Sequence, residues 1–379
     1  MEADRTDPAT LRRSPLDDRH RALGATMTAF AGWEMPLHYG SVVAEHTAVR
    51  EGCGVFDLSH LGTLRVTGDG AEAAVARAFT ADARSLPVGR AVYALCLDDD
   101  GGIVDDLLVY RLPWGFFVVP NAANAATVQA VLREVAGDGC EVADVKADMA
   151  CIAIQGPRAA ELATAAGVDV SDMAYLDCRV LTGTEAEPAA GGGAADAPVP
   201  TSGVLARSGY TGELGFEAFV PAEQAPTLWD RLTAAGATPA GLGARDTLRL
   251  EMGYPLHGQD ISPATSPVEA RLGWAVKGDG FRGEAAYRAA KEAGPRRRLW
   301  GLRATGRGIP RAGCRVRLDG RDVGETTSGT FSPTLRVGIA LAYLDASVGA
   351  ETEVEIDVRG KPVPAVVTRP PFVDRGPKG

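Results

Sequence analysis

Two neighbouring aspartates stand inside a segment that otherwise has the composition of a buried strand. Asp105 and Asp106 follow a glycine-rich turn at residues 98–102 and lie within the apolar run 103–110 (IVDDLLVY). Side chains alternate between the faces of a strand, so the two carboxylates point to opposite faces, both mostly apolar. A carboxylate removed from water must find donors or its pKa rises, which is how enzymes obtain useful acids. Both are catalytic candidates; alternatively, both cap the turn and face water.

A further acid on an apolar element is Glu217, which lies between Phe216 and Ala218 in a predicted strand. The turn before it, residues 207–215 (RSGYTGELG), carries Tyr210 and three glycines. Glycine allows a backbone to approach a flat ligand closely. An exposed turn with a surface tyrosine would have the same composition, so both interpretations stay open.

Residues 244–252 are predicted to form a helix in which Arg245 and Arg249 lie one turn apart. An arginine near a helix start opposes the local dipole, so we expect Arg245 to have a fixed partner. That partner is either an anionic ligand or a carboxylate in a bridge between domains, and the sequence is compatible with both.

Short strands and helices alternate around these candidates without regular β-α-β order, which indicates an α+β fold. Strands are expected at 64–67, 92–97, 104–112, 116–119, 150–155, 204–208 and 216–220, and further helices at 42–51, 69–79, 122–136, 158–166 and 224–234. Residues 16–29 are expected to form a short helix that leads into a loop at 30–36. The Ala-, Gly- and Pro-rich segment 185–200 predicts a disordered surface loop. Residues beyond Gly294 are nearly all short strands with turns, which predicts a terminal β-barrel or sandwich.

Length, charge and composition exclude several classes of protein. A chain of 379 residues is too long for one compact core and indicates two or three domains. A net charge of -10 argues against a broad basic surface for nucleic acid. No segment approaches the roughly 20 apolar residues of a membrane helix, and residues 1–19 resemble no targeting signal, so we expect a cytoplasmic protein that binds no membrane.

Cofactor motifs are weak or missing. The six cysteines form no CxxC pair and the five histidines show no ligand spacing, so no metal is expected. The glycine-rich segments at 68–73 and 241–246 lack the third glycine of a dinucleotide-binding loop. The sequence also contains neither a phosphate-binding P-loop nor a GxSxG nucleophile motif.

Seven short segments, taken in order, resemble one family along nearly the whole chain: the aminomethyltransferases, or T-proteins, of the glycine cleavage system. They are residues 30–37 (FAGWEMPL), 54–62 (GVFDLSHLG), 101–106 (GGIVDD), 119–124 (VPNAAN), 207–217 (RSGYTGELGFE), 241–260 (GLGARDTLRLEMGYPLHGQD) and 327–335 (TSGTFSPTL). The resemblance implies three domains arranged like a cloverleaf around a central folate site, with a β-barrel-like unit at the C-terminus. The implied division is 1–56 with 146–240, then 57–145 with 241–293, and finally 294–379.

The same resemblance implies a one-carbon transfer. An aminomethyl group arrives on the lipoyl arm of the H-protein, tetrahydrofolate accepts the methylene, and ammonia and dihydrolipoyl carrier leave. The key acid falls on Asp106, which would orient the folate and assist proton movement. The residues suited to bind folate are Tyr93, Asn121, Tyr210, Glu217, Arg245 and Tyr254, and Arg245 would serve either the folate or the lipoyl arm. No metal, flavin or nicotinamide is implied, because the oxidation level of the carbon is already set.

The chain departs from the family pattern at Leu61, where Met is usual, and at Thr63, where Glu is common. Leu and Met have similar volumes, so we expect little consequence from Leu61. Two alternatives remain: a stand-alone tetrahydrofolate-dependent demethylase of a small methylated substrate, and a non-enzymatic folate-binding protein of iron–sulfur maintenance. The presence of Asp106 favours an enzyme.

Overall fold

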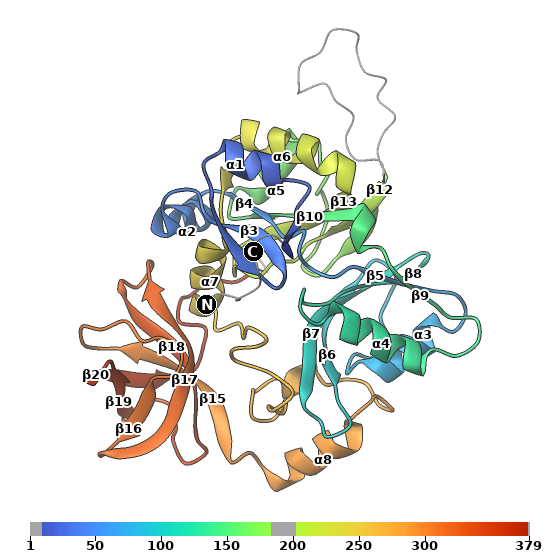
Figure 1. Cartoon of the computed structure of the whole chain (residues 1–379). Coiled ribbons are helices and arrows are strands. Elements are labelled where there is room, and N and C mark those ends of the chain that lie inside the picture. Colours follow the sequence, from blue (N-terminus) through green and yellow to red (C-terminus); the bar gives the residue numbers. More distant parts are fainter. Residues whose placement is uncertain (1–9, 183–201, 378–379) are drawn as a thin grey trace.

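The computed structural model describes residues 10–182 and 202–377, which form helices, three open sheets and one closed barrel. Figure 1 shows three lobes: a sheet covered by helices at the top, a second sheet at the right and the barrel at the lower left. The predicted α+β class and C-terminal barrel are therefore confirmed. The segment 185–200, predicted to be a surface loop, lies outside the described residues. In the described part of the chain, no helix is long and apolar enough to cross a membrane.

The N-terminal region contains a β-hairpin where the sequence predicts a helix over 16–29 and a loop, because the helix ends at Ala22 and a strand begins at Thr26. Helix α1 (Asp17–Ala22) is followed by β2 (Thr26–Phe30) and β3 (Trp33–His38), which pair antiparallel. The predicted loop at 30–36 was wrong. Ala31 and Gly32 have φ of 49° and 79°, so a two-residue turn with positive φ at both positions reverses the chain. Alanine is uncommon at positive φ, which is why the pair gave no hairpin signal.

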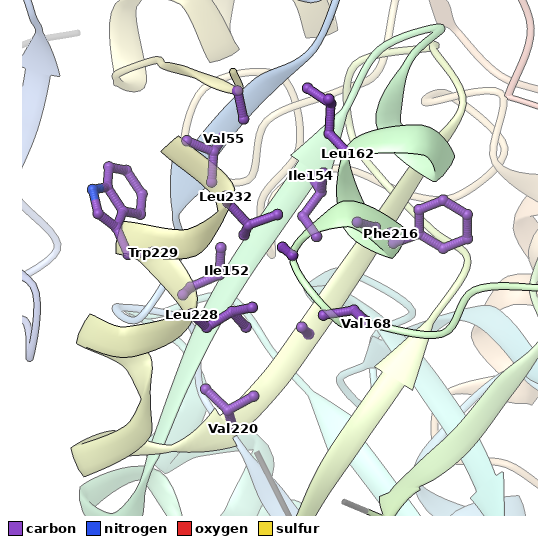
Figure 2. Close-up of a cluster of buried hydrophobic side chains, with 14 of the residues drawn as sticks. Val55, Ile152, Ile154, Leu162, Val168, Phe216, Val220, Leu228, Trp229 and Leu232 are labelled. Atoms are coloured by element: carbon purple, nitrogen blue, oxygen red, sulfur yellow. The ribbon is translucent and has the colours of Figure 1, made fainter. Parts of the chain in front are cut away.

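A six-stranded sheet forms the upper lobe, in the order β11-β12-β13-β10-β4-β14. Its strands are β4 (Gly54–Asp57), β10 (Met149–Gln155), β11 (Cys178–Thr182), β12 (Ser202–Ala206), β13 (Gly215–Pro221) and β14 (Thr238–Pro239). Helices α5 (Ala159–Ala165) and α6 (Ala225–Ala234) cover one face. Figure 2 shows the resulting core, where Leu228 of α6 lies close to Ile152 of β10 and Val220 of β13, and Trp229 of α6 lies at the edge of the cluster.

A five-stranded antiparallel sheet forms the lobe at the right, in the order β6-β7-β8-β5-β9. Its strands are β5 (Leu64–Thr67), β6 (Ala91–Leu97), β7 (Ile103–Leu112), β8 (Gly115–Val119) and β9 (Glu141–Asp144), and its helices are α3 (Ala71–Ala78) and α4 (Ala125–Val135). The strands predicted at 92–97, 104–112 and 116–119 are β6, β7 and β8, which pair antiparallel in sequence order. The turn between β6 and β7 is fixed by Gly101, at φ +81°, and by Asp98, whose Oδ1 accepts a 2.7 Å hydrogen bond from the amide of Gly102.

The two larger sheets meet through aromatic side chains. Phe219 of β13 packs edge-on against Phe117 of β8, with ring centroids 5.1 Å apart, and against Tyr110 of β7 at 6.0 Å. All three side chains are buried. Because edge-to-face packing of large rings fixes relative orientation as well as distance, this cluster sets how β7 faces β13.

The C-terminal lobe is a closed six-stranded barrel in the order β15-β18-β17-β16-β19-β20. Its strands are β15 (Arg297–Ala304), β16 (Arg315–Leu318), β17 (Arg321–Ser332), β18 (Val337–Asp345), β19 (Glu353–Val358) and β20 (Lys361–Thr368). Helix α8 (Glu284–Ala293) precedes it and ends at Gly294, which has φ 73°. A glycine at positive φ is a common way to stop a helix, so the predicted boundary near Gly294 falls at a real helix end.

Helix α7 (Leu242–Glu251) lies at the centre and packs against α2 (Val42–Glu51), β3 and β17. Buried Arg50 of α2 holds this junction with 2.9 Å ion pairs to Glu251 of α7 and to Glu213 before β13. Glu251 also accepts a 2.6 Å hydrogen bond from Ser332 of the barrel. Because α7 packs against α2 and β3 on one side and against β17 and β18 of the barrel on the other, it joins separate lobes, and the residue-level domain boundaries remain a proposal.

Candidate active site

A cavity of about 520 Å³ opens between the two larger sheets and α7. That volume lies within the range that holds a small organic ligand. The proposed catalytic acid and the six residues expected to bind folate all line it: Tyr93, Asp106, Asn121, Tyr210, Glu217, Arg245 and Tyr254. They come from β6, β7, the β8–α4 loop, the turn before β13, β13 itself, α7 and the segment after α7. The fold therefore brings them together, whereas their individual roles remain proposals.

Asp106 faces the cavity from β7. Along this strand Val104, Asp106 and Leu108 are half-buried while the residues between them are buried, so Asp106 stands on the cavity face. Its Oδ2 accepts a 3.0 Å hydrogen bond from the hydroxyl of Tyr93 on β6, and its Oδ1 a 3.0 Å bond from Nδ2 of Asn121. Burial raises the pKa of Asp106, and these two hydrogen bonds oppose the rise.

Asp105 lies on the opposite face of β7 and is fully buried, with 0% of its surface exposed. Three hydrogen bonds reach its carboxylate: 3.0 Å from the backbone amide of Asn121, 2.8 Å from its Nδ2 and 2.7 Å from Nδ2 of Asn124. Burial, followed by the charge of Asp106, raises the pKa of Asp105 to about 7. The alternative in which both acids cap the turn and face water is therefore wrong.

Asn121 connects the two acids. Its Nδ2 lies 2.8 Å from Oδ1 of Asp105, 3.0 Å from Oδ1 of Asp106 and 3.0 Å from the carbonyl oxygen of Asp106. An amide carries two hydrogens on this nitrogen, and the acid pair uses both. Asn121 can therefore offer a ligand only its Oδ1, as an acceptor.

Glu217 is held by its neighbour in the turn. The hydroxyl of Ser208 donates a 2.5 Å hydrogen bond to Oε2 of Glu217, and Glu217 is buried. The other oxygen has no such partner in the described residues and lies at the cavity wall. A carboxylate fixed through one oxygen can accept a hydrogen bond from a ligand with the other.

Two glycines of this turn, Gly209 and Gly215, pack against the buried side chain of Gln155. A side chain at Gly209 or Gly215 would collide with Gln155, because a Cβ added at either glycine would lie well inside van der Waals contact of the Gln155 amide group. Gln155 donates to the carbonyl of Ser208 at 3.1 Å and accepts from the hydroxyl of Thr211 at 2.7 Å. The backbone at these two glycines therefore packs closely against a buried glutamine, and the hydrogen bonds of that glutamine hold the turn in place.

Aromatic and cationic groups form the wall next to Glu217. Tyr210 and Tyr254 stack with ring centroids 5.7 Å apart, and the guanidinium of Arg245 lies 4.7 Å from the centroid of Tyr210. The hydroxyl of Tyr210 donates to the carbonyl of Pro255. Burial lowers the pKa of Arg245 and the charge of Glu217 raises it, so the two side chains are close enough to interact electrostatically.

The arginine that bridges lobes is Arg249, one turn after Arg245. Its guanidinium makes ion pairs of 2.7 Å with Asp260 and 2.8 Å with Asp246, and it donates a 2.8 Å hydrogen bond to Ser328 of the barrel. Arg245 has no ion pair within residues 10–182 and 202–377, so in that part of the chain the carboxylate-bridge alternative applies to Arg249 instead. Arg245 keeps its donors available to the cavity.

Several cavity residues were missed by the sequence analysis. His60 is 4% exposed, packs edge-on against Phe30 at 5.2 Å, and has a buried Nδ1 with no hydrogen-bond partner in the described residues. Burial, followed by the charge of Arg245, lowers its pKa to about 3, so the ring is neutral. His60 lies in residues 54–62, one of the segments that resemble the family, and this position in a family segment was the feature of the sequence that could have marked it.

Further missed residues lie at the edges of the cavity. Trp274 is 61% exposed and stacks on Tyr93 with ring centroids 5.2 Å apart, and Lys277 follows it. Nothing in their sequence context marked them. His257 and Asn124 stood at the ends of family segments and lie 3.0 Å apart, Nδ1 to Nδ2. For residues 10–182 and 202–377, no group of three or more His, Cys, Asp or Glu side chains could hold a metal ion.

Comparison with known proteins decides the family. The sequence model of the GCVT N-terminal domain matches residues 16–280, and that of the glycine cleavage T-protein C-terminal barrel domain matches residues 297–374. The chain belongs to the glycine cleavage T-protein family. The predicted family resemblance is therefore confirmed, and the site lies in the part of the chain matched by the N-terminal domain.

Relatives in this family match over almost their full lengths. An aminomethyltransferase of Parafrankia sp. (strain EAN1pec) is 50% identical over 97% of this chain and 99% of its own. An aminomethyltransferase of Mycobacterium tuberculosis (strain ATCC 25618 / H37Rv) is 46% identical over 97% of this chain and 98% of its own. The crystal structure of the glycine cleavage system aminomethyltransferase T from Bartonella henselae superimposes with a TM-score of 0.87 at 34% identity, covering 97% of this chain and 99% of that one.

Proposed function

We propose that this chain is the aminomethyltransferase of glycine cleavage. It transfers the methylene of an aminomethyl-lipoyl carrier to tetrahydrofolate and releases ammonia and dihydrolipoyl carrier. The observation that carries the proposal is the convergence of seven residues, spread along the sequence from Tyr93 to Tyr254, on one cavity of about 520 Å³. Family membership supports the same reaction, because the relatives described above are aminomethyltransferases.

The chemistry of the cavity suits a reduced pterin. Such a ring is flat, carries several N–H donors and needs acceptors arranged around its edge. The free oxygen of Glu217 and Oδ1 of Asn121 are acceptors of this kind, and Tyr93, Tyr210 and Tyr254 supply flat apolar surface. We propose that these residues bind tetrahydrofolate as the one-carbon acceptor.

Asp106 is proposed as the residue that orients the acceptor nitrogen and assists proton movement. Its carboxylate is held on both oxygens, by Tyr93 and by Asn121, so it cannot rotate freely toward the sheet. A fixed acceptor of raised pKa is suited to take a proton as a new carbon–nitrogen bond forms. Because the two reactants are held in one cavity, positioning supplies much of the acceleration.

Arg245 is proposed to serve either the folate or the arriving lipoyl arm, since its guanidinium lies above Tyr210 and has available donors. The lipoylated H-protein is the proposed partner that brings the aminomethyl group. A cytoplasmic location fits the six cysteines, which are all free thiols.

The deciding experiment is formation of methylene-tetrahydrofolate from an aminomethyl-loaded lipoyl carrier. Ammonia release should require both tetrahydrofolate and the loaded carrier. Equal release from a free methylated amine would favour the demethylase, and folate binding without any transfer would favour the iron–sulfur maintenance protein.

Substitution of the proposed catalytic acid tests its role in the same assay. Asp106→Asn keeps the shape of the side chain but removes its charge, so turnover should be nearly abolished while tetrahydrofolate affinity stays within about tenfold. Asp169→Asn is a matched control, because Asp169 is an exposed acid that contacts Ser171 and Arg179 and does not line the cavity. Wild-type turnover in Asp106→Asn would contradict the assigned role.

A further inference from the structure

A connected set of side chains lies behind Asp106, and the proposed function does not use it. From the cavity inward, Asn121 contacts both Asp106 and Asp105, Asn124 contacts Asp105, and His257 contacts Asn124. His257 in turn contacts the carbonyl oxygen of Ile103, the first residue of β7. We call Asp105, Asn124 and His257 the supporting chain.

The direction of each hydrogen bond in the supporting chain follows from its end groups. A carboxylate accepts, so Asn124 turns Nδ2 toward Oδ1 of Asp105, at 2.7 Å. The second hydrogen on Nδ2 points to Nδ1 of His257, at 3.0 Å, and Nδ1 must then accept. The carbonyl of Ile103 also accepts, so Nε2 of His257 donates to it at 3.1 Å. In this arrangement His257 donates from Nε2 and accepts at Nδ1, so the orientation of its ring is fixed from both sides.

The surroundings of Asp105 make these hydrogen bonds important. Its donors are all neutral amides, and its carboxylate is fully buried. The titratable groups near it are Asp106 on the same strand, Tyr93 and Cys96 on β6, and His257 through Asn124. Burial, followed by the charge of Asp105, raises the pKa of Cys96 to about 12, so that thiol is uncharged. The amides are therefore the main stabilisation of charge on Asp105.

We propose that Asp105, Asn124 and His257 are positioning residues for Asp106, acting through the amide of Asn121 that both carboxylates share. The amide of Asn121 can point a hydrogen at Asp106 only while Asp105 holds the other hydrogen and the backbone amide of the same residue. Asp105 in turn is oriented by Asn124, whose own rotation is fixed by His257. This inference rests on the proposed function, because it concerns the positioning of Asp106, the catalytic acid of that function.

A purely structural role is the competing interpretation. The supporting chain also links the loop before α4 to β7 by hydrogen bonds. If that link were its only role, its loss would lower the stability of the folded protein and leave the chemistry of Asp106 unchanged. The two roles differ in what they change: positioning alters the turnover and pH profile of Asp106, whereas a purely structural link alters the melting temperature. A conservative replacement that restores the hydrogen bonds separates them further.

The variants are chosen to keep the fold. Asp105→Asn has the same shape, but its NH₂ group must face one of the amide donors. At least one of the hydrogen bonds that Asp105 accepts is therefore lost. His257→Phe keeps the ring and loses both hydrogen bonds. His257→Gln can accept from Asn124 and donate to Ile103, and so should recover most of the activity that His257→Phe loses. Asp169→Asn serves as the exposed control.

The measurements are steady-state kinetics against pH, the melting temperature, and an NMR titration of aspartate carboxyl carbons that needs no substrate. We expect kcat to fall about 100-fold in Asp105→Asn and about tenfold in His257→Phe, with the KM for tetrahydrofolate within about threefold of wild type. In wild type the two carboxyl groups should titrate in two coupled steps, whereas in Asp105→Asn the carboxyl group of Asp106 should titrate alone in one step, because the neighbouring acid is gone.

Unchanged kcat and an unchanged pH profile in Asp105→Asn and His257→Phe would overturn the inference. So would a lower melting temperature with a wild-type pH profile, or equal losses in His257→Gln and His257→Phe. If wild type itself forms no methylene-tetrahydrofolate while the carboxyl titration of Asp106 still becomes a single step in Asp105→Asn, the proposed function fails and the coupling of the two acids stands.

Discussion

The hydroxyl of Tyr93 donates a 3.0 Å hydrogen bond to Oδ2 of Asp106 across two adjacent strands. In the register of this antiparallel pair, Tyr93 lies opposite Leu108 and Asp106 lies opposite Leu95, so the two are diagonal neighbours on the cavity face. A tyrosine is long enough to span this diagonal. The hydrogen bond opposes the effect of burial on the pKa of Asp106 and so favours its ionised form.

Tyr93→Phe should therefore raise the pKa of Asp106. If the reaction needs ionised Asp106, activity is lost as pH falls through that pKa, so the acid limb of the kcat/KM profile should move to higher pH. We expect kcat at neutral pH to fall about tenfold, because a hydrogen bond to a charged group contributes roughly 1.5–3 kcal/mol. Tyr343→Phe, which removes a 2.9 Å bond to the carbonyl of Asp260 in the barrel lobe, should leave the profile unchanged. A shift to lower pH in Tyr93→Phe would contradict this account.

Glu217→Gln should weaken binding of tetrahydrofolate more than turnover at saturation. The substitution replaces one acceptor oxygen by a donor and removes the charge that ligand N–H groups would meet. We expect affinity, measured by isothermal titration calorimetry, to fall by about 10–100-fold. Glu223→Gln changes an exposed residue in the connection after β13 and is the matched control. Equal affinities for wild type and Glu217→Gln would remove Glu217 from the binding site.

Arg249→Leu should destabilise the protein severely. Arg249 is 1% exposed, and its loss leaves the fully buried carboxylate of Asp260 without its cation. Breaking a buried ion pair by removing one partner costs about 3–5 kcal/mol of unfolding free energy. The control is Arg158→Leu, which breaks an exposed pair with Glu161 and should change the free energy of unfolding far less, because water already screens that pair. Urea denaturation would measure both, and similar losses would show that Arg249 is not the structural arginine.

His60 predicts a specific loss of stability in acid. Its pKa is about 3 in the folded protein and about 6.5 when unfolded, so the unfolded chain binds a proton that the folded chain excludes. Stability from this residue is present above pH 6.5 and is lost progressively as pH falls toward 3. Near pH 5 the loss should be about 2 kcal/mol.

His60→Leu removes the titrating group, so its unfolding free energy should improve relative to wild type between pH 7 and pH 5. Leu61→Ala is the control, since it removes packing at the next position without changing a titrating group. Its deficit relative to wild type should be the same at both pH values. A parallel fall for wild type and His60→Leu would show that other groups cause the acid sensitivity.

The sequence by itself determined the family, the class of fold and seven of the residues that line the cavity. The acid on an apolar strand, the turn at 207–217 and the arginine helix each stood out from local composition. Strand and helix periodicity depends on nearby residues, which is why β6, β7, β8 and most helices were found within a few positions. The hairpin of β2 and β3 was not predicted, because its turn places Ala31 at positive φ, where alanine is uncommon.

The tertiary structure alone decided which of two similar side chains has which role. Arg249 meets Asp260 and Ser328 while Arg245 meets the cavity, although they lie one helical turn apart. Asp105 meets Asn121 and Asn124, while its neighbour Asp106 meets Tyr93. Hydrogen-bond partners at long sequence separation are chosen by how lobes pack, and a local pattern contains no record of that packing.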